Sequence, residues 1–227
     1  VKGFTGNGGS IHFNFISPQK IKEFNIISLE DFIRNNPDIK SLLCIFSGEE
    51  ANLFYKSLNK VPGAGSLQLY VSPMMLEENN CSAIKEKIDN QVKGFIPWHS
   101  SLDNENNLHF KKIIVEHSSR KANVFSLLGW EAGLIMNIAV QNNINGSEGE
   151  KIVCQLHKTS VKSPRGFLQT DELSNYLIGP VINAGLDATG QVVVDTIIEN
   201  ISPEWKSFMK AEESVVASGW LNTYLCH

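Results

Sequence analysis

Residues that could do chemistry are present in this chain of 227 residues, but their spacing forms no catalytic or metal-binding motif. Ser47 follows an apolar run in "CIFSGEE", outside the GxSxG pattern of a nucleophile elbow, and no histidine–acid pair can be assigned to it. The six histidines show neither HxH nor HExxH spacing, and the four cysteines form no CxxC pair. We therefore expect a protein that is not an enzyme and that uses no cofactor or metal.

Side chains that could contact a ligand follow three apolar runs. The pair Glu49–Glu50 stands at a presumed helix start, where it either complements the helix dipole or places one carboxylate against a ligand amine. The pair Met74–Met75, after Pro73, either fills the core or lines a pocket, since methionine adapts to irregular shapes. Trp98 is open to the same two interpretations.

Bulk properties narrow the class of protein. The net charge is −4 and the basic residues are scattered, which argues against nucleic-acid binding. No apolar run reaches the roughly 20 residues of a membrane span, and no signal peptide opens the chain. Because the first residue is Val1 and not Met, the sequence leaves open whether an export signal has been removed. The glycines of "GFTGNGGS" precede a strand, so they predict a turn and not a nucleotide-binding loop.

Strand and helix patterns alternate along the first half of the chain. The first helix has Ser28 as its expected N-cap and ends at Pro37. Cys44 falls in an apolar run typical of a buried strand. The pattern predicts strands at 9–17, 40–48, 65–73 and 92–100, and helices at 28–39, 49–61 and 79–92.

This alternation predicts βαβ units, a parallel sheet and helices on both of its faces. Ligands of such sheets bind at the carboxyl ends of the strands. The candidate ligand-binding positions are therefore the ends of three strands, at 46–49, 72–75 and 97–99.

The second half of the chain is different. It predicts a helix at 104–119 and a strongly apolar, mostly buried helix at 123–143. A Pro-Arg-Gly turn at 164–166 precedes an expected hairpin linked by Thr170-Asp171-Glu172, and a strand follows at 190–202. The segment 151–160 fits a helix or a strand, and the tail from 203 is partly helical in pattern.

The order of these segments resembles one family. "VKGFTGNGGSIHFNFISP", "FIRNNPDIKSLLCIFSGEEANLFYKSL", "VKGFIPWHSSLDNENNLHFKKII" and "NVFSLLGWEAGLIMNIAV" with "SPRGFLQTDE" follow one another as in the type I periplasmic binding-protein fold. The resemblance is to its branched-chain amino acid and amide class of ABC-transporter solute-binding proteins. The sequence departs from the family pattern at Trp130-Glu131, where Tyr-Asp is usual, and in a longer tail from Ile201.

The resemblance implies an α/β fold of parallel-sheet βαβ lobes linked by hinges near 94–98 and 170–173, with the family's N-terminal portion missing. It divides the chain into a second-lobe segment at 1–95, a first-lobe segment at 96–172, and return strands with a tail at 173–227. With the strand-end argument, it implies ligand contacts from two loops and a strand exit: Phe46, Ser47, Gly48, Glu49, Pro73, Met74, Met75 and Trp98.

The expected function is capture of a small amino-acid-like or small carboxylate ligand between two lobes, outside the cytoplasm, for a membrane ABC permease. We expect a periplasmic or extracellular monomer that binds no nucleic acid. Glu49 would pair with a ligand amine. A ligand-sensing domain of a receptor or regulator with the same fold is the alternative, and an α/β enzyme is a weaker one.

Overall fold

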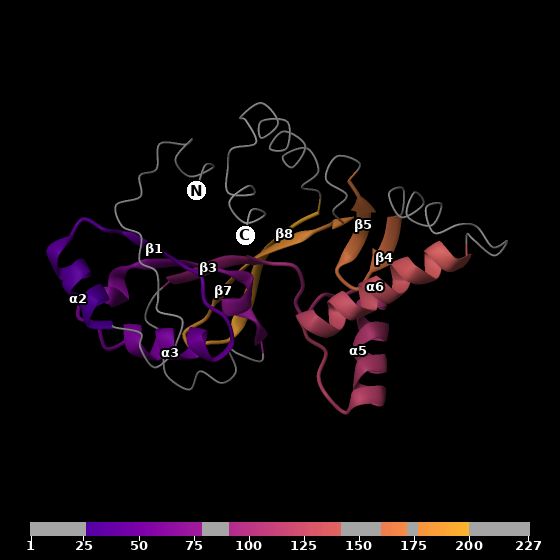
Figure 1. Cartoon of the computed structure of the whole chain (residues 1–227), viewed down its shortest axis with the longest axis horizontal. Helices are drawn as coiled ribbons and strands as arrows, with labels where there is room; N and C mark the ends of the chain where they lie inside the picture. The colour runs from indigo at the N-terminus through magenta and orange to yellow at the C-terminus, as the bar shows by residue number, and fades with distance from the viewer. Residues whose placement is uncertain (1–25, 79–90, 142–159, 172–176, 200–227) are drawn as a thin grey trace, which may run out of the picture.

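Two separate β-sheets organise the chain, each with its own helices (Figure 1). The structure is a computed structural model, and it describes residues 26–78, 91–141, 160–171 and 177–199. The first sheet has five strands in the order β1-β2-β3-β7-β8, and the second has three in the order β4-β5-β6. We call the first sheet with its helices the large unit, and the second with its helices the small unit.

The large sheet is parallel on one side and antiparallel on the other. Three parallel strands are formed by β1 (Ser41–Cys44), β2 (Gln68–Val71) and β3 (Gln91–Ile96). The later strand β7 (Val181–Leu186) pairs antiparallel with β3, and β8 (Val192–Ile198) pairs antiparallel with β7. The predicted βαβ order is therefore confirmed for β1, the helix that follows it and β2, while the helix expected before β3 lies outside the described residues. The return strands make the sheet mixed.

One face of the large sheet is covered by α2 (Ile26–Asn35) and α3 (Gly48–Leu58). The strands alternate, so that Leu69, Val71 and Ile96 point into this core. Side chains of α3 at helical spacing, Phe54 and Leu58 among them, pack against the same face. Alternate residues point to the opposite face and are exposed there: Leu43, Tyr70 and Phe95.

The small unit contains α5 (Glu105–Ser118), α6 (Val124–Gln141) and the strands β4 (Ser160–Ser163), β5 (Gly166–Thr170) and β6 (Leu177–Ile178). Its apolar cluster is small and consists of Trp98, Phe110, Ala122 and Leu127. Polar contacts complete it. Buried Glu131 of α6 accepts hydrogen bonds from Arg165 Nε (2.8 Å), Arg165 Nη2 (3.2 Å) and the Ser163 hydroxyl, which ties α6 to the β4–β5 hairpin.

Within the described residues the chain crosses between the two units twice. After β3 it leaves the large unit at Pro97, and after β6 it returns through Gly179–Pro180. β6 pairs with β5 in the small sheet, so residues 177–178 belong to the small unit. A Cβ at Gly179 would lie 2.2 Å from a methyl carbon of Leu168, so any other residue there would force this buried side chain to move.

Most helices and strands lie where the sequence places them, with three corrections. The first helix already includes Ile26, so Ser28 is inside it and is not its N-cap, although it ends before Pro37 as expected. The expected burial of the apolar helix is wrong, because α6 leaves Phe125, Met136 and Val140 more than 60% exposed. The third correction is that β7 and β8 join the sheet through antiparallel pairs, where a parallel sheet was expected.

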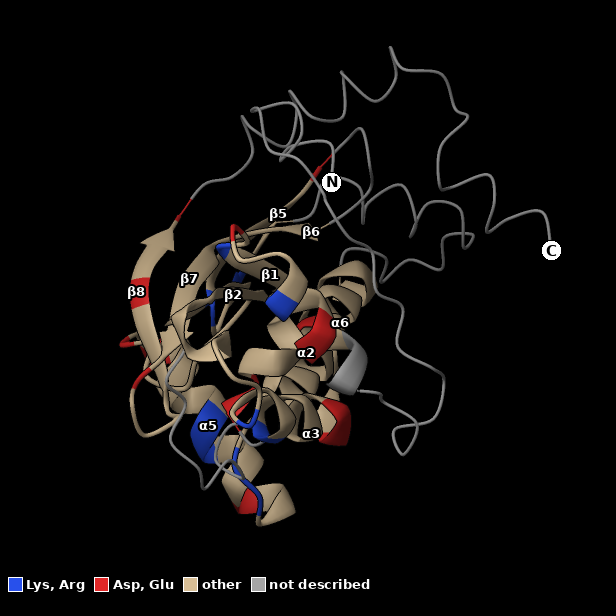
Figure 2. Cartoon of the chain, turned by 90° about the vertical axis from the view of Figure 1, so that its left-hand side faces the viewer, with Lys and Arg blue, Asp and Glu red and all other residues tan. Residues whose placement is uncertain are grey.

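Several predicted segments lie outside the described residues and are not tested. These are the strand at 9–17, the helix over 79–90, the segment 151–159 and the tail after 199. Within the described part, charged residues of both signs are interspersed, as on α5, where Lys112 pairs with Glu116 at 3.8 Å (Figure 2).

Candidate functional site

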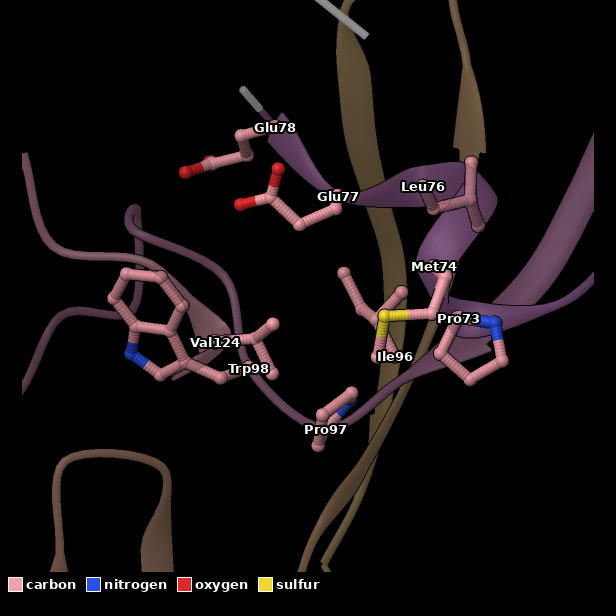
Figure 3. Close-up of a pocket in the computed structure, with 9 residues that line it drawn as sticks. All are labelled: Pro73, Met74, Leu76, Glu77, Glu78, Ile96, Pro97, Trp98 and Val124. Carbon is pink, nitrogen blue, oxygen red and sulfur yellow. The ribbon is translucent and has the colours of Figure 1, made fainter. Parts of the chain in front are cut away.

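A pocket lies where the large unit meets the start of α6. It is formed by the 3₁₀ turn η3 (Pro73–Leu76) after β2, by the exit of β3, and by the first residue of α6. Its wall is mainly apolar, with two carboxylates at its edge (Figure 3). The residues that line it are Pro73, Met74, Leu76, Glu77, Glu78, Ile96, Pro97, Trp98 and Val124.

The turn η3 is held in place by contacts on the large-unit side. Ser72 continues the β2 ladder by donating its N–H to the Cys44 carbonyl (3.0 Å), and its hydroxyl donates to the Phe46 carbonyl (3.0 Å). Pro73 then starts the turn. Met75 is fully buried beneath it, whereas Met74 points into the pocket (Figure 3).

Trp98 is fixed from the small-unit side. Its indole Nε1 donates to the Asn107 side-chain oxygen at 2.8 Å, and its ring meets Phe110 edge to face with centroids 5.8 Å apart. Asn107 is itself fully buried and donates to the carbonyl of Leu102 at 2.7 Å. The hydrogen bond to Asn107 and the ring contact with Phe110 hold the indole as an ordered wall of the pocket.

The acidic edge of the pocket is joined to the crossing after β3. Glu78 Oε1 lies 2.6 Å from His99 Nε2 and accepts a hydrogen bond from the Ser100 hydroxyl at 2.7 Å. Burial raises the pKa of Glu78, but the hydrogen bonds from His99 and Ser100 and the charge of His99 outweigh it and lower that pKa below its ordinary value. Glu78 is therefore a carboxylate at neutral pH.

The other ring nitrogen of His99 faces Ser101. His99 Nδ1 lies 2.7 Å from the Ser101 hydroxyl and also accepts the Ser101 backbone N–H at 3.2 Å. A serine, a histidine and a glutamate thus contact one another in a row. However, His99 Nδ1, the nitrogen that would take the proton of a serine nucleophile, already accepts the Ser101 backbone N–H. We interpret the arrangement as a turn that fixes the histidine and not as a catalytic triad.

The pocket is small and anionic. It holds about 20 Å³, which is room for one water molecule. Its lining includes two glutamates and no lysine or arginine. Among the described residues no cluster of metal ligands is present. The arrangement suits an apolar group beside a positive charge, and the space must widen before a larger molecule enters.

Three of the sequence-predicted site residues line this pocket, and the other five do not. Pro73, Met74 and Trp98 belong to its wall, while Met75 lies behind it. The stretch 46–49 is on the neighbouring strand end: Phe46 stacks on Phe54 with centroids 4.7 Å apart, and Ser47 precedes α3. Gly48 takes the left-handed region (φ 53°), and Glu49 is exposed on α3.

The sequence reasoning missed two parts of the pocket. Glu77 and Glu78 directly follow the predicted Met74–Met75 loop, and two adjacent carboxylates at a strand exit were a signal that could have been used. Val124 arrives from a helix that is distant in the sequence, so no local pattern could have found it.

Cys44 is a core residue, as predicted. It is 4% exposed and not in a disulfide, and burial raises its pKa to about 12. A thiol in this state is unreactive at neutral pH.

This chain resembles known proteins in its structure. No protein-family model and no curated protein matches the sequence. Solved structures do match. A solute-binding protein of an ABC transporter from R. palustris, in complex with benzoate, has a TM-score of 0.67 and 18% identity over 88% of this chain and 55% of that one.

Two further structures are similar to the same degree. A solute-binding protein of an ABC transporter from Rhodopseudomonas palustris BisB5, with 3,4-dihydroxybenzoic acid, has a TM-score of 0.71 and 10% identity over 89% of this chain and 56% of that one. A leucine-binding protein from Thermotoga maritima has a TM-score of 0.67 and 16% identity, with coverages of 86% and 54%.

The chain has the type I periplasmic binding-protein fold, an α/β fold with a parallel-strand sheet. The resemblance seen in the sequence is thereby confirmed for the fold. The chain spans about 55% of the length of the benzoate-binding protein.

Proposed function

We propose that this chain binds a small solute between its two units, as an extracytoplasmic solute-binding protein that serves an ABC-type importer. The observation that carries the proposal is the pocket at the junction of η3, the β3 exit and α6, in a fold whose matched structures are solute-binding proteins. The role in a complex with a membrane permease and a location outside the cytoplasm are parts of this proposal.

The polarity of the pocket favours an amino-acid-like ligand with an apolar side chain. Glu77 and Glu78 offer negative charge to an ammonium group, and Met74 and Trp98 offer an apolar surface to a side chain. A simple benzoate would place its carboxylate near these two acidic side chains, of which Glu78 is already paired with His99. We therefore expect binding of amines with apolar bodies in preference to small carboxylates that have no amine.

Binding requires the two units to separate and close again. A space of about 20 Å³ does not hold an amino acid, so η3 and the start of α6 have to move apart for entry. The two crossings at 97 and 179–180 are where such a movement is absorbed. The expected lobe boundaries at residues 95 and 172, and ligand contacts from Phe46, Ser47, Gly48, Glu49 and Met75, stay predictions.

The test is isothermal titration calorimetry of the purified chain with leucine, phenylalanine, phenethylamine and benzoate. Heat with the amines and none with benzoate supports the proposal. Glu77→Gln should weaken amine binding at least about tenfold, because a charge-assisted hydrogen bond is worth roughly 1.5–3 kcal/mol. Glu49→Gln makes the same change at the exposed start of α3 and tests the ligand contact that is predicted there.

Two results would count against this assignment. If Glu49→Gln weakens binding and Glu77→Gln does not, the ligand site is the neighbouring strand end at 46–49. If none of the four compounds binds to a folded sample, the chain is not a receptor for this class of ligand.

A further inference from the structure

A carboxylate of the large unit reaches across the edge of the pocket to the small unit. Glu78 follows η3, and its Oε1 lies 2.6 Å from His99 Nε2 and accepts a hydrogen bond from the Ser100 hydroxyl at 2.7 Å. The Ser100 backbone N–H donates to the same oxygen at 3.4 Å. One carboxylate oxygen therefore has three partners, and all of them belong to two adjacent residues of the crossing after β3. We call this set of interactions the Glu78 contact.

Each end of the Glu78 contact is held by its own unit. On the large-unit side, Leu76 is fully buried shortly before Glu78 in the chain. On the small-unit side, α5 holds the Ser100 carbonyl, which accepts hydrogen bonds from Lys111 Nζ (2.7 Å) and Asn107 Nδ2 (3.3 Å). The Glu78 contact therefore joins the two units and is not an internal contact of one loop.

The Glu78 contact spans the same gap that has to widen when a solute enters. The turn η3 forms one wall of the pocket, and Trp98 and Val124 come from the small-unit side (Figure 3). Glu78 extends from the first wall, and its partners His99 and Ser100 directly follow Trp98 in the second. Because a hydrogen bond is lost beyond about 3.5 Å, a separation of the walls by a few ångströms breaks the contact.

We propose that the Glu78 contact is a latch, which holds the pocket closed and has to break before a solute enters. The entry of a solute rests on the function proposed above, whereas the closing of the pocket does not depend on it. The latch is weak, because the Glu78 side chain is 30% exposed and water competes for its oxygens. It lowers the open fraction of the chain by about two- to fivefold.

The sharpest way to break the latch is Ser100→Ala. Ser100 does not line the pocket, so the substitution leaves the ligand-facing side chains unchanged. The Ser100 carbonyl keeps its two donors from α5, so the loop stays in place. The substitution removes the hydroxyl that donates to Glu78.

The experiment measures how fast a thiol inside the pocket is alkylated. Val124 lines the pocket and is 8% exposed, so Val124→Cys places a thiol there that iodoacetamide reaches when the pocket opens. Mass spectrometry of peptides reads the label at residue 124 separately from the natural cysteines. Cys44, buried in the core of the large unit, reports unfolding of that core in the same sample. The Val124→Cys chain is the parent of this series.

Ser100→Ala should raise the alkylation rate at residue 124 about two- to fivefold and leave Cys44 unlabelled. Ser100→Thr keeps the hydroxyl and should restore the rate of the parent. The matched control is Ser118→Ala, because the Ser118 hydroxyl donates to the Ile114 carbonyl within α5 and touches neither the pocket nor Glu78. The control should alkylate at the rate of the parent.

A second substitution tests whether Ser100 acts through the carboxylate. Glu78→Ala should raise the alkylation rate at least as much as Ser100→Ala does, and adding Ser100→Ala to it should change nothing further. The proposal is overturned if Ser100→Ala alkylates at the rate of the parent. It is also overturned if Ser100→Ala keeps its full effect in the Glu78→Ala chain, because the hydroxyl would then act elsewhere.

Stopped-flow association of phenylalanine separates the latch from the proposed function. If phenylalanine binds, Ser100→Ala should raise its association rate constant by the same factor as the alkylation rate, and an unchanged rate constant overturns the latch. If phenylalanine does not bind while the alkylation rates change as expected, the latch stands and the ligand class proposed above is wrong.

Discussion

The two units of this chain are stabilised in different ways. The large unit has a continuous apolar core that runs from Leu29 of α2 to Ala184 of β7. The small unit has an apolar cluster around Trp98 and Phe110, and it relies on buried Asn107, Glu131 and Ser163 for the rest. Apolar packing tolerates substitution by similar volumes, whereas a buried hydrogen-bond network fails when a single partner is removed.

This difference determines where substitutions will act most strongly. A lost methylene group in the large unit leaves a cavity that neighbouring side chains can partly fill. A lost donor in the small unit leaves a charge or a polar atom without a partner in a poorly solvated place, and nothing nearby can replace it.

Arg165→Leu should have the largest effect. It leaves the Glu131 carboxylate, with a side chain that is 4% accessible, without its cation, and we expect a loss of about 3–5 kcal/mol in the free energy of unfolding. The measurement is urea unfolding followed by circular dichroism. The double variant Glu131→Gln with Arg165→Leu should recover a good part of the loss. Equal losses in both variants would mean that the ion pair does not hold α6.

Leu69→Ala tests the large unit. Leu69 is fully buried in β2, and the substitution should lower the free energy of unfolding by about 3 kcal/mol through lost burial and a cavity. Leu53→Ala on α3, where the side chain is 38% exposed, is the control and should change it by about 0.5 kcal/mol or less. The same urea titration measures both. A similar loss in the two variants would contradict the position of the core.

Asn107→Ala compares two adjacent asparagines of α5. Asn107 is fully buried and accepts from Trp98 while donating to two carbonyls, so its removal should lower the free energy of unfolding by about 2 kcal/mol. Asn106→Ala, one residue earlier and exposed, should be close to neutral. The measurement is the thermal unfolding midpoint of each of the two variants. If the two variants have the same midpoint, the polar network does not stabilise the small unit.

Glu78→Gln should have the smallest effect, and one that depends on pH. The pKa of Glu78 is lowered on folding, so the carboxylate stabilises the folded chain above its ordinary pKa of 4.5, and this stabilisation is lost as the pH falls through the lower folded value. The pair with His99 is partly exposed, so we expect about 1 kcal/mol or less at neutral pH. Unfolding midpoints of the two proteins should converge in acid. A difference in unfolding midpoint that stays constant with pH would show that the charge of the Glu78 carboxylate is not its cause.

The parallel strands and the loops at their ends could be predicted from the sequence, because buried strands and amphipathic helices leave local hydrophobic patterns. The same patterns place Met74 and Trp98 at strand ends, and both side chains line the pocket. It was not sufficient for Val124, which reaches the pocket from α6 through tertiary packing. It also predicted a buried α6 from apolar composition, yet composition does not report which side of a helix another part of the molecule covers.

The two crossings between the units lie on neighbouring strands. β3 ends at Ile96 and β7 begins at Val181, and Ile96 pairs with Ile182 in the antiparallel ladder, so the two connections run side by side at roughly the 4.8 Å spacing of adjacent strands. One connection alone would leave the units free to swivel in any direction. Two adjacent connections suppress twisting and leave bending about a single axis, the line that joins Pro97 to Pro180. From these two connections of the described residues we expect one easy relative motion of the units, a bend about this line.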